Sequence, residues 1–158
     1  MSLTKDIEKL LPHRSPFLFV DEIISADEKG SVSEHVFTES EFFFKGHFPE
    51  YPVVPGVILV ETMAQAGGAA LSFQNVFEKN ALFFLATVDK VKFRSQVRPG
   101  DKVRMEIVNL RVSPRMVKQA GKAYVGCGLG GKAHRRSSRN YRRVVCAGKR
   151  SGREDRFL

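Results

Sequence analysis

The sequence VILVETMAQAGGAALSFQNVF, residues 57–77, constrains the fold more than any other part of the chain. It contains no proline, has the length of one helix, and is apolar nearly all round. Only three polar residues interrupt it before Ser72: Glu61, Thr62 and Gln65. A helix of this kind has to be covered by protein on most sides. Its alanines and glycines would let a sheet approach closely, so we expect one central helix inside a curved sheet.

The sequence on both sides of this helix predicts an antiparallel sheet, and hence an α+β fold. Strands are indicated by β-branched and aromatic residues and by alternation of apolar with polar residues. We expect them at residues 17–24, 32–38, 83–97, 102–110 and 116–125. Turn residues at Asp27–Gly30 join the first two strands into a hairpin, and Pro99–Asp101 forms a further turn. A short helix over Thr4–Leu11, ended by Pro12, precedes them.

Composition is that of a single domain with a substantial core. The chain has 158 residues, of which 42% are hydrophobic and 27% charged, which suits one packed domain. The longest apolar run, around residues 53–60, is broken by Pro55 and Gly56, so we expect no membrane span. The N-terminus lacks the apolar core of a secretory signal, and Cys127 and Cys146 form no disulfide framework or zinc cluster. These features predict a cytoplasmic protein.

The last quarter of the chain differs from the rest. Residues 1–118 carry equal numbers of basic and acidic side chains, so the net charge of +9 belongs to residues 119–158. Glycine, arginine and serine dominate from Gly126, and the few residues that suggest a strand there are Tyr141, Val144 and Val145. We divide the chain into a domain at 1–125 and an atypical basic tail at 126–158. Three explanations stay open: a disordered extension, a segment that binds nucleic acid or acidic partners, and a shifted reading frame, which the abrupt change favours.

His47 and Glu61 stand out as candidates for chemistry. His47 lies in a loop that three prolines stiffen, so its side chain can be held in place. A carboxylate on a buried helix is costly unless it is paired or protonated, so burial should raise the pKa of Glu61 toward that of a general acid. Gln65 could hold Glu61 by a hydrogen bond, and Gly56 at the helix N-terminus offers a free backbone N–H. These groups suit a proton transfer beside a polarised carbonyl.

Other interpretations of the same residues carry comparable weight. A lone histidine in a loop is usually a surface or packing residue, which is what we expect of His13 and His35. Glu61 could lie on a solvent-facing stripe, although its apolar surroundings disfavour this. The proline spacing also fits a ligand for an aromatic groove, but it is embedded in aromatic core-forming sequence. On the residues alone, an active site at His47 and Glu61 is about as well supported as its absence.

Longer motifs change this balance. GHFPEYPVVPGVILVETMAQAGG, residues 46–68, strongly resembles the signature of the (3R)-3-hydroxyacyl-acyl carrier protein dehydratases of type II fatty acid synthesis. LPHRSPFLFVDEI at 11–23 and FLATVDKVKFRSQVRPGD at 84–101 resemble two further blocks of that family. The resemblance covers about residues 5–125, in order and without large gaps. Glu61 matches the branch with glutamate at this position, whereas aspartate marks the branch that also isomerises its product.

The resemblance implies a hot-dog fold, in which a curved antiparallel sheet wraps a long central helix. It also implies a homodimer as the catalytic unit, often with three dimers in a hexamer. The active site would lie at the dimer interface, with His47 from one chain and Glu61 from the other. The family closes its sheet with an apolar and acidic strand after residue 125, where this chain has its basic tail, so the adjacent strand would lack its partner.

The implied activity is that of a hydro-lyase of fatty acid biosynthesis. It would convert a (3R)-3-hydroxyacyl chain on acyl carrier protein into the trans-2-enoyl thioester and water. His47 would remove the C2 proton, and Glu61, oriented by Gln65, would protonate the leaving hydroxyl. The Gly56 N–H would polarise the thioester carbonyl. The family implies no metal or redox cofactor, because the phosphopantetheine thioester itself acidifies C2.

The same resemblance implies an acyl tunnel and a docking surface. Three apolar residues would line the tunnel: Phe48, Val54 and Val57. Acyl carrier protein is acidic, so a basic surface should meet it. Strand alternation would place three candidates on one face: Lys90, Lys92 and Arg94. An ordinary solvated strand face explains these three residues nearly as well. The main alternative is an acyl thioester hydrolase or a thioester-binding protein on the same fold. A nucleic-acid-binding function rests on the tail alone and is the weakest of the three.

Overall fold

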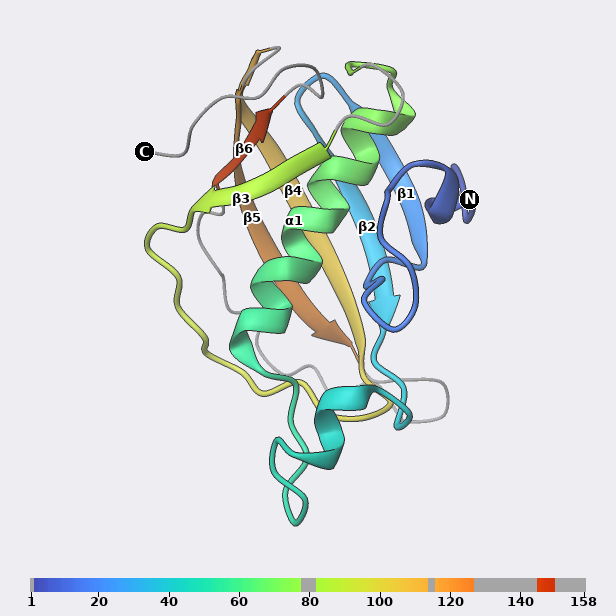
Figure 1. Ribbon diagram of the computed structural model, residues 1–158, viewed down its shortest axis with the longest axis vertical. Helices are drawn as coiled ribbons and strands as arrows, with labels where there is room; N and C mark the ends of the chain where they lie inside the picture. The colour runs from blue at the N-terminus through green and yellow to red at the C-terminus, as the bar shows by residue number, and fades with distance from the viewer. Residues whose placement is uncertain (1, 78–81, 114–115, 127–144, 150–158) are drawn as a thin grey trace.

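One long helix lies against an antiparallel sheet in the computed structural model, which describes residues 2–77, 82–113, 116–126 and 145–149 (Figure 1). The helix is α1 (Gly56–Phe73). The sheet has the strand order β1-β2-β4-β5, formed by β1 (Glu22–Asp27), β2 (Gly30–Val36), β4 (Lys102–Ser113) and β5 (Met116–Gly126). A second sheet pairs β3 (Leu82–Thr87) with β6 (Val145–Lys149). This arrangement confirms the predicted α+β fold of the hot-dog type.

Tight turns set the register of the four-stranded sheet. At the β1–β2 hairpin Asp27 pairs with Gly30, and its Oδ1 accepts hydrogen bonds from the backbone N–H of Lys29 and Gly30 at 2.8 and 3.0 Å. The pairing of Ser113 with Met116 closes the β4–β5 hairpin in the same antiparallel sense. The predicted hairpin at residues 27–30 is therefore confirmed.

Helix α1 packs against all four strands of this sheet (Figure 1). Most of its residues are buried, including Met63, Ala66 and Ala69. Gly67 lies so close to β5 that a β-carbon there would overlap the side-chain amide of Gln119. The small residues of α1 therefore bring helix and sheet together, as the sequence predicts.

By length and composition alone, α1 could also cross a membrane. It has 18 residues with a mean hydropathy of 1.3, and 56% of this stretch is buried inside the protein. The break at Pro55 and Gly56 therefore does not by itself exclude a span, since α1 begins at Gly56. A core helix passes the same test, and burial against the sheet accounts for the composition of α1.

The N-terminal elements are shorter than predicted. The expected helix is a single 3-10 turn, η1 (Ile7–Lys9). The first strand begins only at Glu22: the Asp21 N–H still donates to the Glu34 carbonyl of β2, but the backbone before it bonds to a side chain of α1. The Gln65 Oε1 accepts a hydrogen bond from the Phe19 N–H at 2.8 Å, and its Nε2 donates to the Phe17 carbonyl at 3.1 Å. The same amide therefore anchors the N-terminal segment on the central helix.

Two other elements end earlier than predicted. Helix α1 stops at Phe73, and Asn75 shortly after it has a φ of 55°, which ends regular helix. The strand expected at residues 83–97 is regular only over β3, and Lys90 beyond it also has a φ of 55°. A left-handed backbone cannot continue a strand. The predicted alternation of faces beyond Thr87 is therefore wrong.

Strand β6 lies inside the segment predicted to be an atypical tail, and its pairing with β3 is antiparallel. The predicted strand hint at Tyr141 and Val144 lies outside the described residues, whereas Val145 begins β6. Most of residues 126–158 also lie outside them, so the boundary at residue 125 stays a prediction.

Candidate active site

His47 lies in the loop between the 3-10 helix η2 (Phe42–Lys45) and α1, held by backbone bonds on both sides. Its N–H donates to the Phe43 carbonyl at 2.9 Å, and its own carbonyl accepts from the Val53 N–H at 3.3 Å. The Nδ1 lies 2.9 Å from the Val53 carbonyl oxygen. A carbonyl only accepts hydrogen bonds, so Nδ1 carries the proton. In the neutral ring the unprotonated Nε2 is then free to accept a proton.

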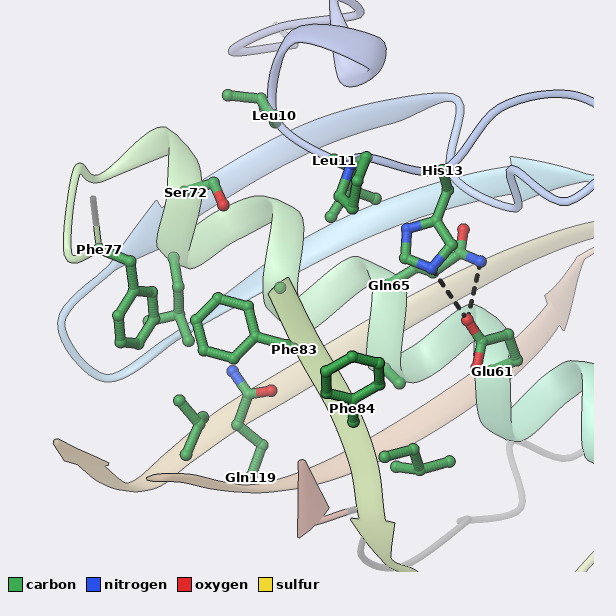
Figure 2. A pocket seen from close by; sticks show the side chains of 16 residues that line it. Leu10, Leu11, His13, Glu61, Gln65, Ser72, Phe77, Phe83, Phe84 and Gln119 are labelled. Atoms are coloured by element: carbon green, nitrogen blue, oxygen red, sulfur yellow. Dashed lines mark hydrogen bonds and ion pairs between the residues drawn. The ribbon is translucent and has the colours of Figure 1, made fainter. Parts of the chain in front are cut away.

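Glu61 lies on the second turn of α1, with its side chain 22% exposed. The Gln65 Nε2 donates to its Oε1 at 3.0 Å, as the spacing predicts. The Nε2 of His13 lies 3.5 Å from the same oxygen (Figure 2). His13 comes from the N-terminal segment that Gln65 anchors, so one glutamine holds the carboxylate and the backbone that carries its histidine neighbour.

The pKa of Glu61 departs from the expectation. The hydrogen bond from His13 lowers the pKa of this carboxyl, burial raises it, and the Gln65 amide and the charge of His13 lower it further. The lowering influences outweigh burial, so the pKa lies below the usual value rather than above it. The predicted upward shift is wrong, because burial on α1 is incomplete and two donors face the carboxylate.

A pocket runs from Glu61 along one face of α1 (Figure 2). His13, Glu61 and Gln65 form one end, and Ser72, Phe83 and Gln119 lie toward the other. The walls between them are mostly apolar and include Leu11, Ala64, Gly68, Leu71, Phe84 and Val117. Ser72 lies eleven positions after Glu61 on the helix, which is a rise of about 16.5 Å. The site therefore joins a carboxylate to a narrow apolar space.

The described chain does not bring His47 and Glu61 together. The described contacts of the Glu61 side chain are with His13 and Gln65, whereas the His47 ring contacts the Val53 carbonyl and stacks on Phe48 with centroids 4.3 Å apart. The pairing of His47 with Glu61 across two chains stays a prediction.

Gly56 begins α1, as predicted, so its N–H belongs to the first turn, where helical N–H groups have no intrahelical acceptor. The structure adds a packing reason for glycine here. A β-carbon at this position would overlap the ring of Phe93. The role of this N–H toward a thioester carbonyl stays a prediction.

The predicted tunnel residues lie elsewhere than the pocket. Val54 is buried, whereas Phe48 is 56% and Val57 75% exposed. None of the three lines the described pocket. The exposed apolar surface of Phe48 and Val57 is typical of a site for another molecule or another chain.

The predicted docking residues are all exposed: Lys90, Lys92 and Arg94. Strand alternation does not place these three side chains on one face, because the backbone is irregular there. Their role toward a carrier protein stays a prediction that rests on their charge.

His13 is the site residue that sequence reasoning missed. It was expected to be a surface or packing residue, yet it contacts Glu61. Its position in the block LPHRSPF, two residues after Leu11, was the available signal. Among the described residues, no three histidine, cysteine, aspartate or glutamate side chains gather as metal ligands.

Known proteins resemble this chain over most of its length. The sequence profile of the FabA-like domain matches residues 11–131. The 3-hydroxyacyl-[acyl-carrier-protein] dehydratase FabZ of Koribacter versatilis is 45% identical over 122 residues, which cover 77% of this chain and 78% of that protein. FabZ of Clostridium perfringens is 48% identical over 110 residues, which cover 68% of this chain and 78% of that protein.

A solved structure, "The Dehydratase Heterocomplex ApeI:P from Xenorhabdus doucetiae", shares the fold. It matches with a TM-score of 0.70 at 15% identity, over 92% of this chain and 91% of that chain. Because the domain match and the relatives' identity extend over the elements that build the site, this chain belongs to the FabA-like family and, within it, to the 3-hydroxyacyl-[acyl-carrier-protein] dehydratases.

Proposed function

We propose that this protein removes water from a (3R)-3-hydroxyacyl thioester carried on acyl carrier protein and produces the trans-2-enoyl thioester. The observation that carries the proposal is the Glu61 carboxylate, which two neighbouring side chains hold at one end of a mostly apolar pocket. The reaction needs a proton donor close to C3 and an apolar space for the chain beyond it. The pocket offers the apolar space and a carboxyl group that serves as the donor once it is protonated.

His47 acts as the base in this proposal. The Val53 carbonyl fixes its proton on Nδ1, so Nε2 accepts the C2 proton of the substrate. The electron pair of the C2–H bond forms the C2=C3 double bond as the C3–O bond breaks. Glu61 gives its proton to the departing hydroxyl, which leaves as water, and the Gly56 N–H stabilises charge on the thioester oxygen. One such donor contributes about 3 kcal/mol.

Covering Glu61 prepares it to act as an acid. Burial is the influence that raises the pKa of this carboxyl, while His13 and Gln65 lower it. A bound acyl chain or a second protein chain would exclude water from the carboxylate and strengthen the influence of burial. The protonated form would then become more populated in the complex with substrate.

We further infer a cytoplasmic homodimer, or a hexamer built from three dimers, in which His47 of one chain meets Glu61 of another. Large apolar side chains are exposed on the loop before α1, in its first turn and on β3: Phe48, Tyr51, Val57, Phe84 and Leu85. Exposed apolar surface of this extent favours association. A dimer would also give His47 the acidic partner that the described contacts within one chain do not supply.

The proposal is tested by following two products from one substrate. A 3-hydroxyacyl chain on acyl carrier protein should give enoyl thioester without release of free thiol. The variants His47→Ala and Glu61→Gln should each lose most of this turnover while staying folded. Release of thiol instead would support the alternative hydrolase, and binding without turnover would support a thioester-binding protein.

The carrier protein should meet the basic residues beyond β3. Changing Lys90, Lys92 and Arg94 together to glutamate should raise KM for the protein-borne substrate but not for the same acyl chain on free pantetheine. The matched control changes three basic residues of β4 and β5 to glutamate: Arg111, Lys118 and Lys122. An equal rise in KM for the control would remove the first three from the docking surface.

A further inference from the structure

The two oxygens of Glu61 have different surroundings. Both described polar contacts of this side chain end on Oε1, one from the Gln65 Nε2 at 3.0 Å and one from the His13 Nε2 at 3.5 Å (Figure 2). Within the part of the chain that the structure describes, Oε2 has no polar partner. A carboxylate that is held through one oxygen offers the other to a ligand.

His13 is held in position without help from Glu61. The Arg14 Nη1 donates to the carbonyls of Leu11 and His13 at 2.8 and 2.7 Å. The Phe17 N–H donates to the Arg14 carbonyl at 2.8 Å, and the Phe17 ring stacks on the imidazole at 6.5 Å with an angle of 23°. This turn therefore presents the ring to α1, and the contact with Glu61 does not depend on a freely moving side chain.

A packing role alone does not explain a histidine at this position. Its Nδ1 is buried and has no hydrogen-bond partner among the described residues. Burying a polar atom without a partner is unfavourable, and an apolar residue of similar size would avoid that penalty. The property that an apolar ring lacks is the Nε2 that faces Glu61.

We propose that His13 is a positioning residue for dehydration: its Nε2 holds Oε1 of Glu61, so that Oε2 is directed to the C3 hydroxyl of the substrate. The proposal rests on the proposed function of Glu61 and assigns a role to a residue that the reaction chemistry does not require. Gln65 and His13 act from different elements, so together they fix the plane of the carboxylate. His13 does not itself contact the reacting atoms.

The charge of His13 also influences the pKa of Glu61. The residues of β3 and β5 that line the pocket carry no charge: Phe83, Phe84, Leu85, Val117 and Gln119. The other charged group of the N-terminal turn, Arg14, is directed to Glu8 at 3.9 Å. His13 is therefore the titratable neighbour of Glu61 in the pocket, and it lowers the pKa of that carboxyl.

Two substitutions distinguish the effect of the Nε2 donor of His13 from the effect of its aromatic ring. His13→Phe keeps an aromatic ring against Phe17 but removes the donor, whereas His13→Gln keeps a nitrogen donor without the charge. We expect kcat to fall about tenfold in His13→Phe, because one orienting contact is lost, with KM changed less than kcat. His13→Gln should recover most of this loss. Glu8→Gln, an exposed change in the same segment, serves as the control.

A titration that needs no substrate completes the test. With ¹³C-labelled glutamate carboxyl groups, Glu61 should titrate at a higher pH in His13→Phe than in the wild-type protein, with His13→Gln between them. An unchanged titration midpoint, or kcat equal to that of the wild type in His13→Phe, would overturn the proposal. If the wild type dehydrates no substrate, the proposed function fails, and the titration still decides whether His13 controls Glu61. Should His13→Phe not fold, His13→Leu, which also lacks the donor, carries both measurements.

Discussion

Two of the histidines that the structure describes contact carboxylates, and burial of the imidazole separates the two sites. His13 lies 3.5 Å from Glu61 at the end of the pocket, with the side chains 29% and 22% exposed. His35 lies 2.9 Å from Asp21 with only 5% of its side chain exposed. The same pair of chemical groups thus occurs once in a pocket that a ligand can reach and once with the imidazole buried against the sheet, although the carboxylate of Asp21 is 50% exposed.

The surroundings of His35 are those of a structural contact. The rings of Phe19 and Phe37 meet it edge-on, with centroids 6.0 and 4.6 Å away. The second oxygen of Asp21 accepts a hydrogen bond from the Val36 N–H at 2.8 Å. The pair therefore joins the segment before β1 to the end of β2. The comparison teaches that access to a pocket, rather than the residue types, distinguishes a candidate catalytic pair from a structural one.

The largest effect should separate the two carboxylates by activity. Glu61→Gln removes the proposed proton donor but keeps the shape of the side chain, so dehydration should fall about 10²- to 10⁴-fold. Asp21→Asn alters the other pair in the same way and should leave the rate per folded molecule close to that of the wild type. Rates on acyl carrier protein, normalised to the folded fraction, measure both. Equal losses would show that the comparison between the two sites is wrong.

The sequence predicted only part of the contact between His35 and Asp21. The hairpin that carries His35 was predicted because Asp27–Gly30 is a strong local turn signal, and local signals need no tertiary information. The bond of His35 to Asp21 joins residues fourteen positions apart across a strand register that the sequence does not state. The sequence therefore predicted a structural role for His35, as a surface or packing residue, but did not predict its contact with Asp21.

The sequence also predicted only part of the candidate site. Glu61 and Gln65 are four residues apart on one helix, so their hydrogen bond follows from helix geometry alone. The contact of His13 depends on how the N-terminal segment crosses α1, and the Gln65 amide decides this crossing. Because this contact was not foreseen, the pKa of Glu61 was predicted in the wrong direction. Burial and the Gln65 hydrogen bond were visible in the sequence, whereas the lowering influence of His13 was not.

The next effect should separate the two histidines by stability. His35→Leu replaces a buried ring in the core and removes the partner of Asp21, so the free energy of unfolding should fall by about 2–4 kcal/mol. His13→Leu, at a more exposed site, should cost less than half as much. Urea unfolding followed by circular dichroism measures both. If His13→Leu proved the more destabilising change, the pocket pair would be the structural one.

A smaller effect should appear in the pH dependence of stability. Burial raises the pKa of Asp21, but the hydrogen bond and charge of His35, the Val36 N–H and the charge of Lys102 outweigh it, so the pKa is lowered. A carboxylate with a lowered pKa stabilises the fold above its ordinary value of 3.8, and this contribution is lost as pH falls through the folded-state value. The Tm difference between wild type and Asp21→Asn should therefore be steady near neutral pH and shrink below about pH 3.8. A difference that grew on acidification would contradict this sign.

The smallest effect concerns Glu41, which lies 3.9 Å from the Nε2 of His35, on the other side of the ring from Asp21. Burial raises the pKa of this carboxyl and outweighs the lowering charge of His35. A carboxylate with a raised pKa destabilises the fold above the folded-state value, and the penalty disappears below the ordinary value of 4.5. Glu41→Gln should thus raise Tm slightly at neutral pH, and this gain should vanish as the pH is lowered past 4.5. Because Asp21→Asn is expected to lower Tm over the same neutral range, thermal unfolding of both variants across pH tests whether the two carboxylates beside one buried imidazole act with opposite sign.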